Sequence, residues 1–467
     1  MSLHPLRAAY RRMAVVMPGL ALLAAALLML MASAPGRAQR VSDVRSTPHN
    51  LSVNGPGSVH ATAGGTDQVC VFCHTPHGAT QADQGGTPLR APLWNRRVPA
   101  GSSYTPYSSS SLDAASIAEG FSGQPGGSSK LCLSCHDGTL AIGSVNVMGG
   151  RGPVDIAMDG TGPGGTMPPG PQGATSGYTR LLGQDLGNDH PISLSFTAAL
   201  AQRDGELRVP DAQQRVPPGS GSTLGLRSPG FKPLLPLEPT GPGGTGQVQC
   251  ATCHDPHLRE LDASQGNQKF LRAPRFQQAA PSPVASPATD IICLNCHDKN
   301  GSFGAWAYSA HARPEVADEV YKDGAASLRQ FPLGLPVWRA GCLNCHDTHT
   351  VQGARRLTRE GTDAPLPAGN PLAARQGGNP ALEQTCYQCH TNAAKSALLA
   401  ATQVPDIETE FGQAIRMPIT TAEQGGATAE VHDSAASFID AGIDCSGAAS
   451  RCGADGLEHR DTLARRH

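Results

Sequence analysis

The sequence is poor in aromatic residues, in charge and in long apolar runs. Phe, Trp and Tyr make up 4% of the 467 residues, and Asp, Glu, Lys and Arg make up 16%. So few large apolar side chains cannot fill an ordinary core in a chain of this length. A formal net charge of -2 argues against a nucleic-acid-binding protein, which is normally basic. Only one long apolar run is present, which excludes a membrane protein with several spans.

This apolar run lies at the N-terminus and has the pattern of a secretory signal peptide. An arginine-containing start precedes the apolar residues 13–34, and Gly36 and Ala38 supply the small residues of a cleavage site. We expect residues 1–38 to be removed and the mature chain, without a transmembrane span, to reach the periplasm, the cell surface or the extracellular space. The alternative is an uncleaved membrane anchor.

Cysteine and histidine are abundant instead. Twelve of the fourteen cysteines lie in six copies of the pattern Cys-x-x-Cys-His, which we number motifs 1 to 6 in chain order. The first cysteines are Cys70, Cys132, Cys250, Cys293, Cys342 and Cys386, the second are Cys73, Cys135, Cys253, Cys296, Cys345 and Cys389, and the histidines are His74, His136, His254, His297, His346 and His390. This pattern is the attachment site of c-type haem. Both thiols form thioethers with the haem vinyl groups, and the histidine is the proximal ligand of the iron.

Two other kinds of site also use paired cysteines. Zinc sites and redox-active disulfides both contain Cys-x-x-Cys. Neither requires a histidine directly after the second cysteine, and neither explains six copies. We therefore predict six covalently bound haem c groups. Their porphyrins supply the apolar surface that the side chains lack, so the expected fold is mostly irregular coil with short α-helices wrapped around a stack of haems, with little or no β-sheet.

Six further histidines are predicted to bind the irons from the distal side. Motifs 1, 3 and 5 carry a second histidine three residues after the proximal one, and an isolated histidine precedes each pair of motifs. A residue three positions from the proximal histidine lies on the wrong side of its own haem, so the histidines of the first group are expected to ligate neighbouring haems. The candidates are His77, His257 and His349 in the first group and His49, His190 and His311 in the second.

Several alternatives to this ligand set remain open. The six histidines could instead face solvent, and other side chains could bind the irons. The spare histidines are His60, His432 and His459, of which His432 is the best substitute, and the axial methionine candidates are Met148, Met158, Met167 and Met417. If every iron has two histidine ligands, no coordination position is left for a substrate, so the chain transfers electrons and is not an enzyme. The alternative function is a multihaem redox enzyme with one open haem site.

The first motif pair resembles a known family. The segment His49-Asn50-Leu51-Ser52, the segment Thr75-Pro76-His77 after motif 1, and the segment from Ala91 to Arg96 are similar to the opening of multihaem c-type cytochromes with paired motifs from metal-respiring and related bacteria. This resemblance implies electron transfer along closely spaced haems, mostly with two histidine ligands, between a quinol-linked donor and a periplasmic or extracellular acceptor. Some members form filaments in which a histidine of one subunit completes a haem of the next. By that resemblance His49 is the expected residue.

The motif spacing also divides the chain. We expect a signal peptide over 1–38, haem-pair units over 39–205, 206–300 and 301–400, and a haem-free tail over 401–467.

Secondary structure between the motifs is expected to be sparse. The Gly- and Pro-rich stretches 150–175 and 205–246 are predicted to be loops, and short helices are expected just after several motifs and over 392–402. In the tail, Cys445 and Cys452 are predicted to form a disulfide, as is usual in exported proteins. The alternative is free or intermolecular thiols.

Overall fold

The structure is a computed structural model, and it describes all six motifs and all six predicted distal histidines. The described residues are 40–108, 112–114, 124–169, 180–224, 231–240, 244–299, 306–349, 357–359, 383–391, 396, 398–400, 404–407, 415–416 and 431–432. The predicted signal peptide, Cys445 and Cys452 lie outside these residues.

The helices in this part of the chain are short. The α-helices are α2 (Gly127–His136), α3 (Ala198–Asp204), α4 (Cys250–Cys253), α5 (Asp323–Leu328), α6 (Val337–Ala340) and α8 (Glu383–Tyr387). The 3-10 helices are η1 (Val44–Ser46), η2 (Cys70–Phe72), η3 (Gly101–Ser103), η5 (Pro163–Gly165), η6 (Ala263–Gln265), η7 (Ile292–Asn295), η8 (Trp306–Tyr308), η9 (Ala310–Ala312) and η10 (Gly341–Asn344). None of the described helices is long and apolar enough to cross a membrane.

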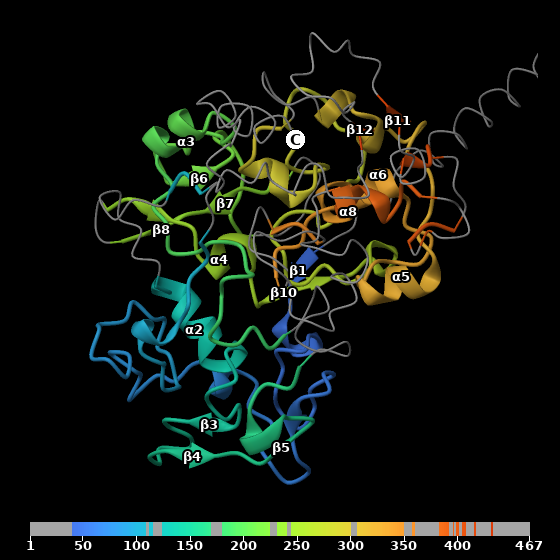
Figure 1. Ribbon diagram of the computed structural model, residues 1–467. Coiled ribbons are helices and arrows are strands. Elements are labelled where there is room, and N and C mark those ends of the chain that lie inside the picture. The colour runs from blue at the N-terminus through green and yellow to red at the C-terminus, as the bar shows by residue number, and fades with distance from the viewer. Residues whose placement is uncertain are drawn as a thin grey trace, which may run out of the picture.

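The strands form two-stranded antiparallel ribbons of two or three residues per strand. The pairs are β1 (Arg40–Ser42) with β10 (Leu258–Glu260), β2 (His60–Ala61) with β5 (Met158–Asp159), β3 (Ser144–Val145) with β4 (Val154–Asp155), β6 (Arg215–Val216) with β7 (Leu235–Pro236), β8 (Glu238–Pro239) with β9 (Gly246–Gln247), and β11 (Ile415–Arg416) with β12 (Val431–His432). Figure 1 shows α2 with β3, β4 and β5 in the lower part of the view, and α3 with β6, β7 and β8 at the upper left.

The positions of the helices differ from the expectation in one respect. Several of them lie on the Cys-x-x-Cys-His motifs themselves, as with η2, α4 and η7, whereas the sequence predicted helices just after the motifs. The reason is local, because each Cys-x-x-Cys-His segment closes one helical turn. The expected helix over 392–402 is not seen in its described residues, where Leu399 instead forms an isolated bridge with Tyr321.

The two Gly- and Pro-rich stretches, predicted to be loops, also carry strands. Strands β4 and β5 lie within 150–175, and β6, β7 and β8 lie within 205–246. Val216 and Leu235, which face each other across the β6–β7 ribbon, are both buried. Apolar residues between the prolines and glycines therefore let these stretches form short paired strands with a buried face. The many Gly and Pro residues had predicted loops there.

Buried apolar side chains form several small clusters and not one large core. One contains Val71 and Phe72, a second contains Phe196 and Val216, and a third is built around Tyr321. Each cluster has a motif cysteine packed against it: Cys73, Cys296 and Cys389 respectively. The described core is thus distributed among the attachment motifs.

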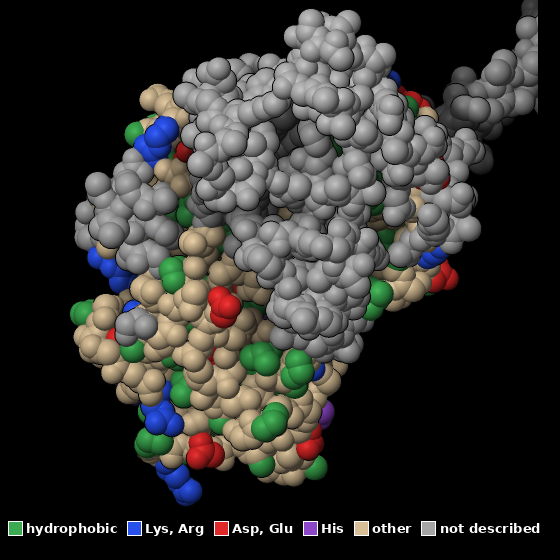
Figure 2. All heavy atoms as spheres, in the orientation of Figure 1, with side chains coloured by type: hydrophobic (Ala, Val, Ile, Leu, Met, Phe, Trp, Pro, Cys, Tyr) green, Lys and Arg blue, Asp and Glu red, His purple; other side chains and the backbone are tan. Residues whose placement is uncertain are grey.

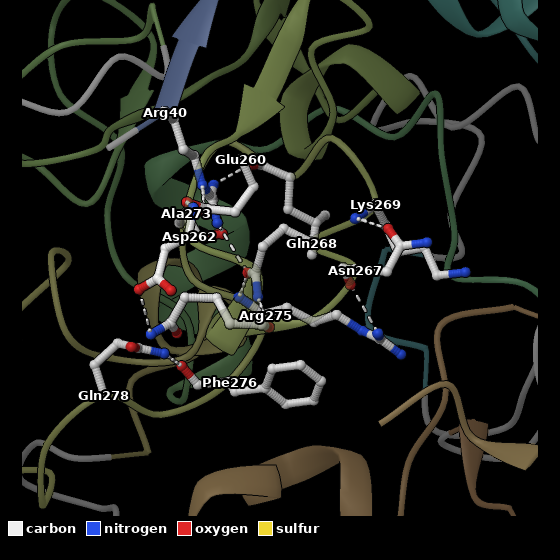
Figure 3. A network of polar contacts seen from close by, with 12 residues as sticks. Arg40, Glu260, Asp262, Asn267, Gln268, Lys269, Ala273, Arg275, Phe276 and Gln278 are labelled. Atoms are coloured by element: carbon white, nitrogen blue, oxygen red, sulfur yellow. Dashed lines mark hydrogen bonds and ion pairs between the residues drawn. The ribbon is translucent and has the colours of Figure 1, made fainter. Parts of the chain in front are cut away.

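A buried arginine anchors the start of the described chain to the segment after motif 3. Arg40 in β1 is 3% exposed, and its guanidinium binds Glu260 at 2.9 Å, Gln268 Oε1 at 2.8 Å and the carbonyl oxygen of Ala273 at 3.2 Å. Figure 3 shows this network between β1 and the strand β10 beside it. The contacts fix the segment that leads to His49.

Candidate functional site

Each Cys-x-x-Cys-His motif forms one closed helical turn. The N–H group of the proximal histidine donates to the carbonyl of the first cysteine at 2.8 Å in motifs 1 and 6 and at 2.9 Å in motifs 3, 4 and 5. Motif 2 is the last turn of α2. Positions i, i+3 and i+4 share one face of a helix, so this turn presents both thiols and the imidazole on the same side. All twelve motif cysteines are free thiols, and each is at least partly exposed.

Five of the proximal histidines each face one of the predicted distal histidines. The ring centroids of the pairs are 5.8 to 6.4 Å apart. The five imidazole pairs are His136 with His49, His74 with His257, His297 with His190, His254 with His349, and His390 with His311. Two imidazoles that bind one metal ion from opposite sides, each through a bond of about 2 Å, have centroids about 6 Å apart. The pairs therefore have the separation that axial ligation requires.

Backbone carbonyl groups hold most of these rings by the nitrogen that faces away from the partner. The Nδ1–H groups of four proximal histidines donate to carbonyl oxygens: His74 to Pro92 at 2.7 Å, His136 to Arg180 at 2.6 Å, His254 to Lys269 at 2.7 Å and His390 to Pro405 at 3.2 Å. His49 and His190 make the same contact with Pro256 and Pro191, at 3.3 and 3.0 Å. A hydrogen bond at Nδ1 leaves Nε2 as the ligand atom and fixes the plane of the ring.

Two distal rings are held by carboxylates instead. Nδ1 of His257 lies 2.9 Å from Asp255 Oδ1, and Nδ1 of His349 lies 2.8 Å from Asp189 Oδ1. The hydrogen bond that His257 donates to the carboxylate of Asp255 raises the pKa of His257. Burial acts to lower the pKa of His349, but the hydrogen bond and charge of Asp189 outweigh it, so the pKa is raised. Sequence reasoning missed both aspartates, although each is next to, or two residues from, a predicted ligand.

Burial keeps several other paired rings neutral. Burial, and then the neighbouring His136, lower the pKa of His49 to about 4. The same two causes, burial and then the facing ring, lower the pKa of His254 to about 4 and that of His297 to about 3. A neutral imidazole keeps the lone pair that a metal ligand must provide.

A turn that the sequence did not reveal follows motifs 1, 3 and 5. The chain returns to form an isolated antiparallel bridge with the proximal histidine, and the residue before the bridge has a positive φ of 54° to 62°. The bridges are His74 with Trp94, His254 with Leu271, and His346 with Thr358, and the residues with positive φ are Leu93, Phe270 and Leu357. The number of residues between the proximal histidine and its bridge partner differs among the three motifs. The bridge partners also belong to three different residue types, so the sequence shows no repeat there.

The residue after each bridge closes the turn on its motif. Its N–H group donates to the carbonyl of the second cysteine, and its side chain donates to the carbonyl of the residue after the first cysteine. These residues are Asn95, with bonds of 2.9 and 2.6 Å, Arg272, with bonds of 2.8 and 2.8 Å, and Arg359, with bonds of 2.8 and 2.9 Å. The same turn thus fixes three motifs by the same contacts.

Thiols of successive motifs touch at two places. The side chain of Cys132 in motif 2 lies beside that of Cys250 in motif 3, and the side chain of Cys293 in motif 4 lies beside that of Cys342 in motif 5. The first contact raises the pKa of Cys132 and lowers the pKa of Cys250 to about 7. Motifs that are 118 and 49 residues apart in the sequence are therefore neighbours in space.

The other candidates have different surroundings. His77 is exposed, and in the described part of the chain its ring faces no other imidazole. His49, which the resemblance singled out for a bond to another subunit, faces His136 of its own chain. Nδ1 of His60 binds the carbonyl of Gly57 at 3.1 Å, and Met148 and Met158 pack on the cluster around Phe72. His432 lies in β12, and Met417 and His459 lie outside the described residues.

The donor set fits a c-type haem. Each motif offers two free thiols and an imidazole on one face of a turn, and the second imidazole comes from elsewhere in the chain. Within the described residues, no group of three or more His, Cys, Asp or Glu side chains is arranged to hold a metal ion. No protein-family model matches the chain, and no curated protein matches its sequence.

Proposed function

We propose that the chain is a hexahaem c-type cytochrome that transfers electrons in the periplasm or outside the cell. The observation that supports this most strongly is the set of five imidazole pairs, because each joins a proximal histidine of a motif to a second imidazole at 5.8 to 6.4 Å. Such a pair would supply two imidazole ligands to one haem, which would then exchange electrons and have no position for a substrate at its iron.

Three kinds of group would hold the six haems. The motif thiols would form the covalent attachment, and the proximal and distal imidazoles would offer Nε2 to the iron. Backbone carbonyls and two aspartates orient the rings through Nδ1. When bound, the haems supply the reversible one-electron chemistry of iron. The thiol contacts between motifs 2 and 3, and between motifs 4 and 5, support close spacing of the haems at these two places.

The imidazole pairs follow a repeating rule. Each even motif pairs with the isolated histidine upstream of its motif pair, as His136 does with His49. Motifs 1 and 3 pair with the second histidine of the next odd motif, as His74 does with His257. The second histidine of an odd motif therefore serves the motif two steps earlier in the chain. For His77 in motif 1, no earlier motif exists in the sequence.

This rule supports assembly of the chain with copies of itself. We infer that exposed His77, and not His49, ligates a haem of a second copy. If copies follow one another in series, the motif two steps before motif 1 is motif 5 of the preceding copy. His77 would therefore ligate the haem of that motif, which begins at Cys342. The two surfaces involved are different, so repetition of this contact from copy to copy gives an open filament when the rotation between copies does not close a ring.

The partners that suit this function are redox proteins. A quinol-linked donor on one side and a periplasmic or extracellular acceptor on the other are the expected pair. Figure 2 shows basic and acidic side chains interspersed on the visible described surface, which suits transient contacts with such proteins better than binding to nucleic acid.

The direct test is the covalent haem content of the exported protein. We expect the mass of the unreduced, denatured protein to exceed that of the chain from residue 39 by six haems, and the pyridine haemochrome spectrum to give the same count. Replacing Cys386 and Cys389 by alanine should remove one haem. A mature protein without covalent haem would refute the proposal.

A further inference from the structure

Asp189 is a buried carboxylate that contacts one of the paired imidazoles directly. Its Oδ1 lies 2.8 Å from Nδ1 of His349, and its side chain is 6% exposed. Oδ2 accepts a hydrogen bond from the side-chain amide of Asn188 at 3.1 Å. Within the described residues, His349 is the ion-pair partner of Asp189, and no Lys or Arg forms a salt bridge with it. The negative charge is therefore directed at the imidazole.

The backbone fixes Asp189 in this position. The N–H group of His190, the next residue, donates to the carbonyl of Thr348 at 2.9 Å, and the N–H group of Asp189 donates to the carbonyl of Leu186 at 3.2 Å. The segment 188–190 is thus joined to the end of motif 5 by a backbone bond as well as by the carboxylate. Such double attachment leaves little freedom for the carboxylate to turn away.

The second aspartate that holds a distal ring differs in two respects. Asp255 is 15% exposed and contacts His257, whose side chain is 51% exposed against 35% for His349, and Arg272 lies 3.3 Å from the other oxygen of the same carboxylate. Water and the guanidinium both weaken the effect of this charge. The six rings held by backbone carbonyls face only neutral acceptors.

We propose that Asp189 lowers the reduction potential of the haem held by His254 and His349 below the potentials of the haems at the other four imidazole pairs. This rests on the proposed function. A carboxylate at Nδ1 draws the N–H proton away from the ring and makes Nε2 a stronger donor to the iron. The stronger donor stabilises the ferric form, and hydrogen bonding around a haem ligand is a recognised control of its potential. Burial preserves the charge from screening.

The experiment is a redox titration of the holoprotein and its Asp189→Asn variant, followed by the haem α band. Asparagine keeps a hydrogen-bond acceptor but removes the charge. One haem should become easier to reduce by at least tenfold in its equilibrium constant, about 59 mV for a one-electron couple. Asp255→Asn is the matched control and should produce a smaller shift, and Asp189→Glu should restore most of the original potential. An unchanged titration with six intact haems would overturn the inference.

A second measurement needs no change at Asp189. In His349→Ala the haem at His254 loses a ligand, so the EPR signal that turns high-spin identifies this haem. In the unaltered protein, we expect the same signal to be the last of the five to vanish on reduction. If another signal vanishes later, the inference is wrong. The haem count distinguishes failure of this inference from failure of the proposed function. A protein without six covalent haems contradicts the proposed function itself, whereas a protein with six haems and another order of reduction contradicts only the inference about Asp189.

Discussion

Each imidazole pair combines a local contact with a distant one. A proximal histidine such as His74 is fixed by its own turn, through its bond to the carbonyl of Cys70. Its partner His257 comes from a segment 183 residues later and is positioned by packing between segments. The proximal ligand and the thiols are therefore properties of the motif, whereas the distal ligand is a property of the folded chain.

Removal of His257, a proposed distal ligand, should leave haem attachment undisturbed. We expect His257→Ala to retain six covalent haems, because both thiols of motif 1 and His74 remain. One haem should change from low-spin to high-spin in the EPR spectrum of the oxidised protein, and its potential should rise. His60→Ala is the control, since His60 faces no proximal histidine in the described residues. Identical low-spin spectra for both variants would show that His257 is not a ligand.

Among the larger elements, helix α2 depends on a buried ion pair. Lys130 in α2 lies two residues before Cys132, the first residue of motif 2, and its ammonium group binds the carboxylate of Asp83, with side chains that are 8% and 0% exposed. The other carboxylate oxygen accepts from the N–H groups of Gly85 and Thr87 at 2.9 and 2.8 Å. Burial raises the pKa of Asp83, but these partners outweigh it, and the pKa is lowered. The loop around Asp83 therefore fixes the helix that carries motif 2.

Breaking this pair should destabilise the protein. Lys130→Met leaves the carboxylate buried without its cation, which costs about 3–5 kcal/mol. The thermal midpoint of the holoprotein should fall clearly, at unchanged haem content. The double variant Lys130→Met with Asp83→Asn removes the charge and should recover part of the loss. If the single and double variants melt together at the original temperature, the pair does not stabilise α2.

The sequence predicted the members of the imidazole pairs better than their arrangement. The six motifs could be identified because attachment chemistry demands fixed residues at fixed spacing, and the histidines near them were few. Which ring faces which could not be predicted, since that depends on contacts between distant segments such as β1 and β10. The role of Asp189 was hidden for the same reason, and the turns through Leu93, Phe270 and Leu357 vary in length and type.

For the whole molecule, haem and fold should depend on each other. The buried clusters are small, and the three largest each touch a motif cysteine, as the cluster around Phe72 touches Cys73. Below a certain core size, proteins need metals or covalent links to be stable.

We expect the chain produced without haem attachment to lack cooperative unfolding and to be degraded rapidly by protease. The holoprotein should resist both. Circular dichroism during heating and limited proteolysis measure the difference. A haem-free chain that melts as cooperatively as the holoprotein would contradict this dependence.

Assembly is the second property of the whole molecule that can be tested. His77→Ala should keep six haems but should abolish filaments, because in the proposed assembly His77 supplies the contact between copies. Negative-stain electron microscopy and light scattering give the readout, and His60→Ala is again the control. Filaments of the variant that are indistinguishable from the original would exclude His77 as the joining residue.

The most direct test of the ligand pairs is low-temperature EPR of the oxidised protein, with haem counted independently as pyridine haemochrome. We predict six haems per chain and low-spin signals that account for at least five of them in separated copies. A sixth, high-spin haem should become low-spin on assembly if His77 binds it. Two or more high-spin haems in the unaltered protein would show that the imidazole pairs are not axial ligand pairs. A single high-spin haem that persists after assembly would favour an enzyme with an open iron.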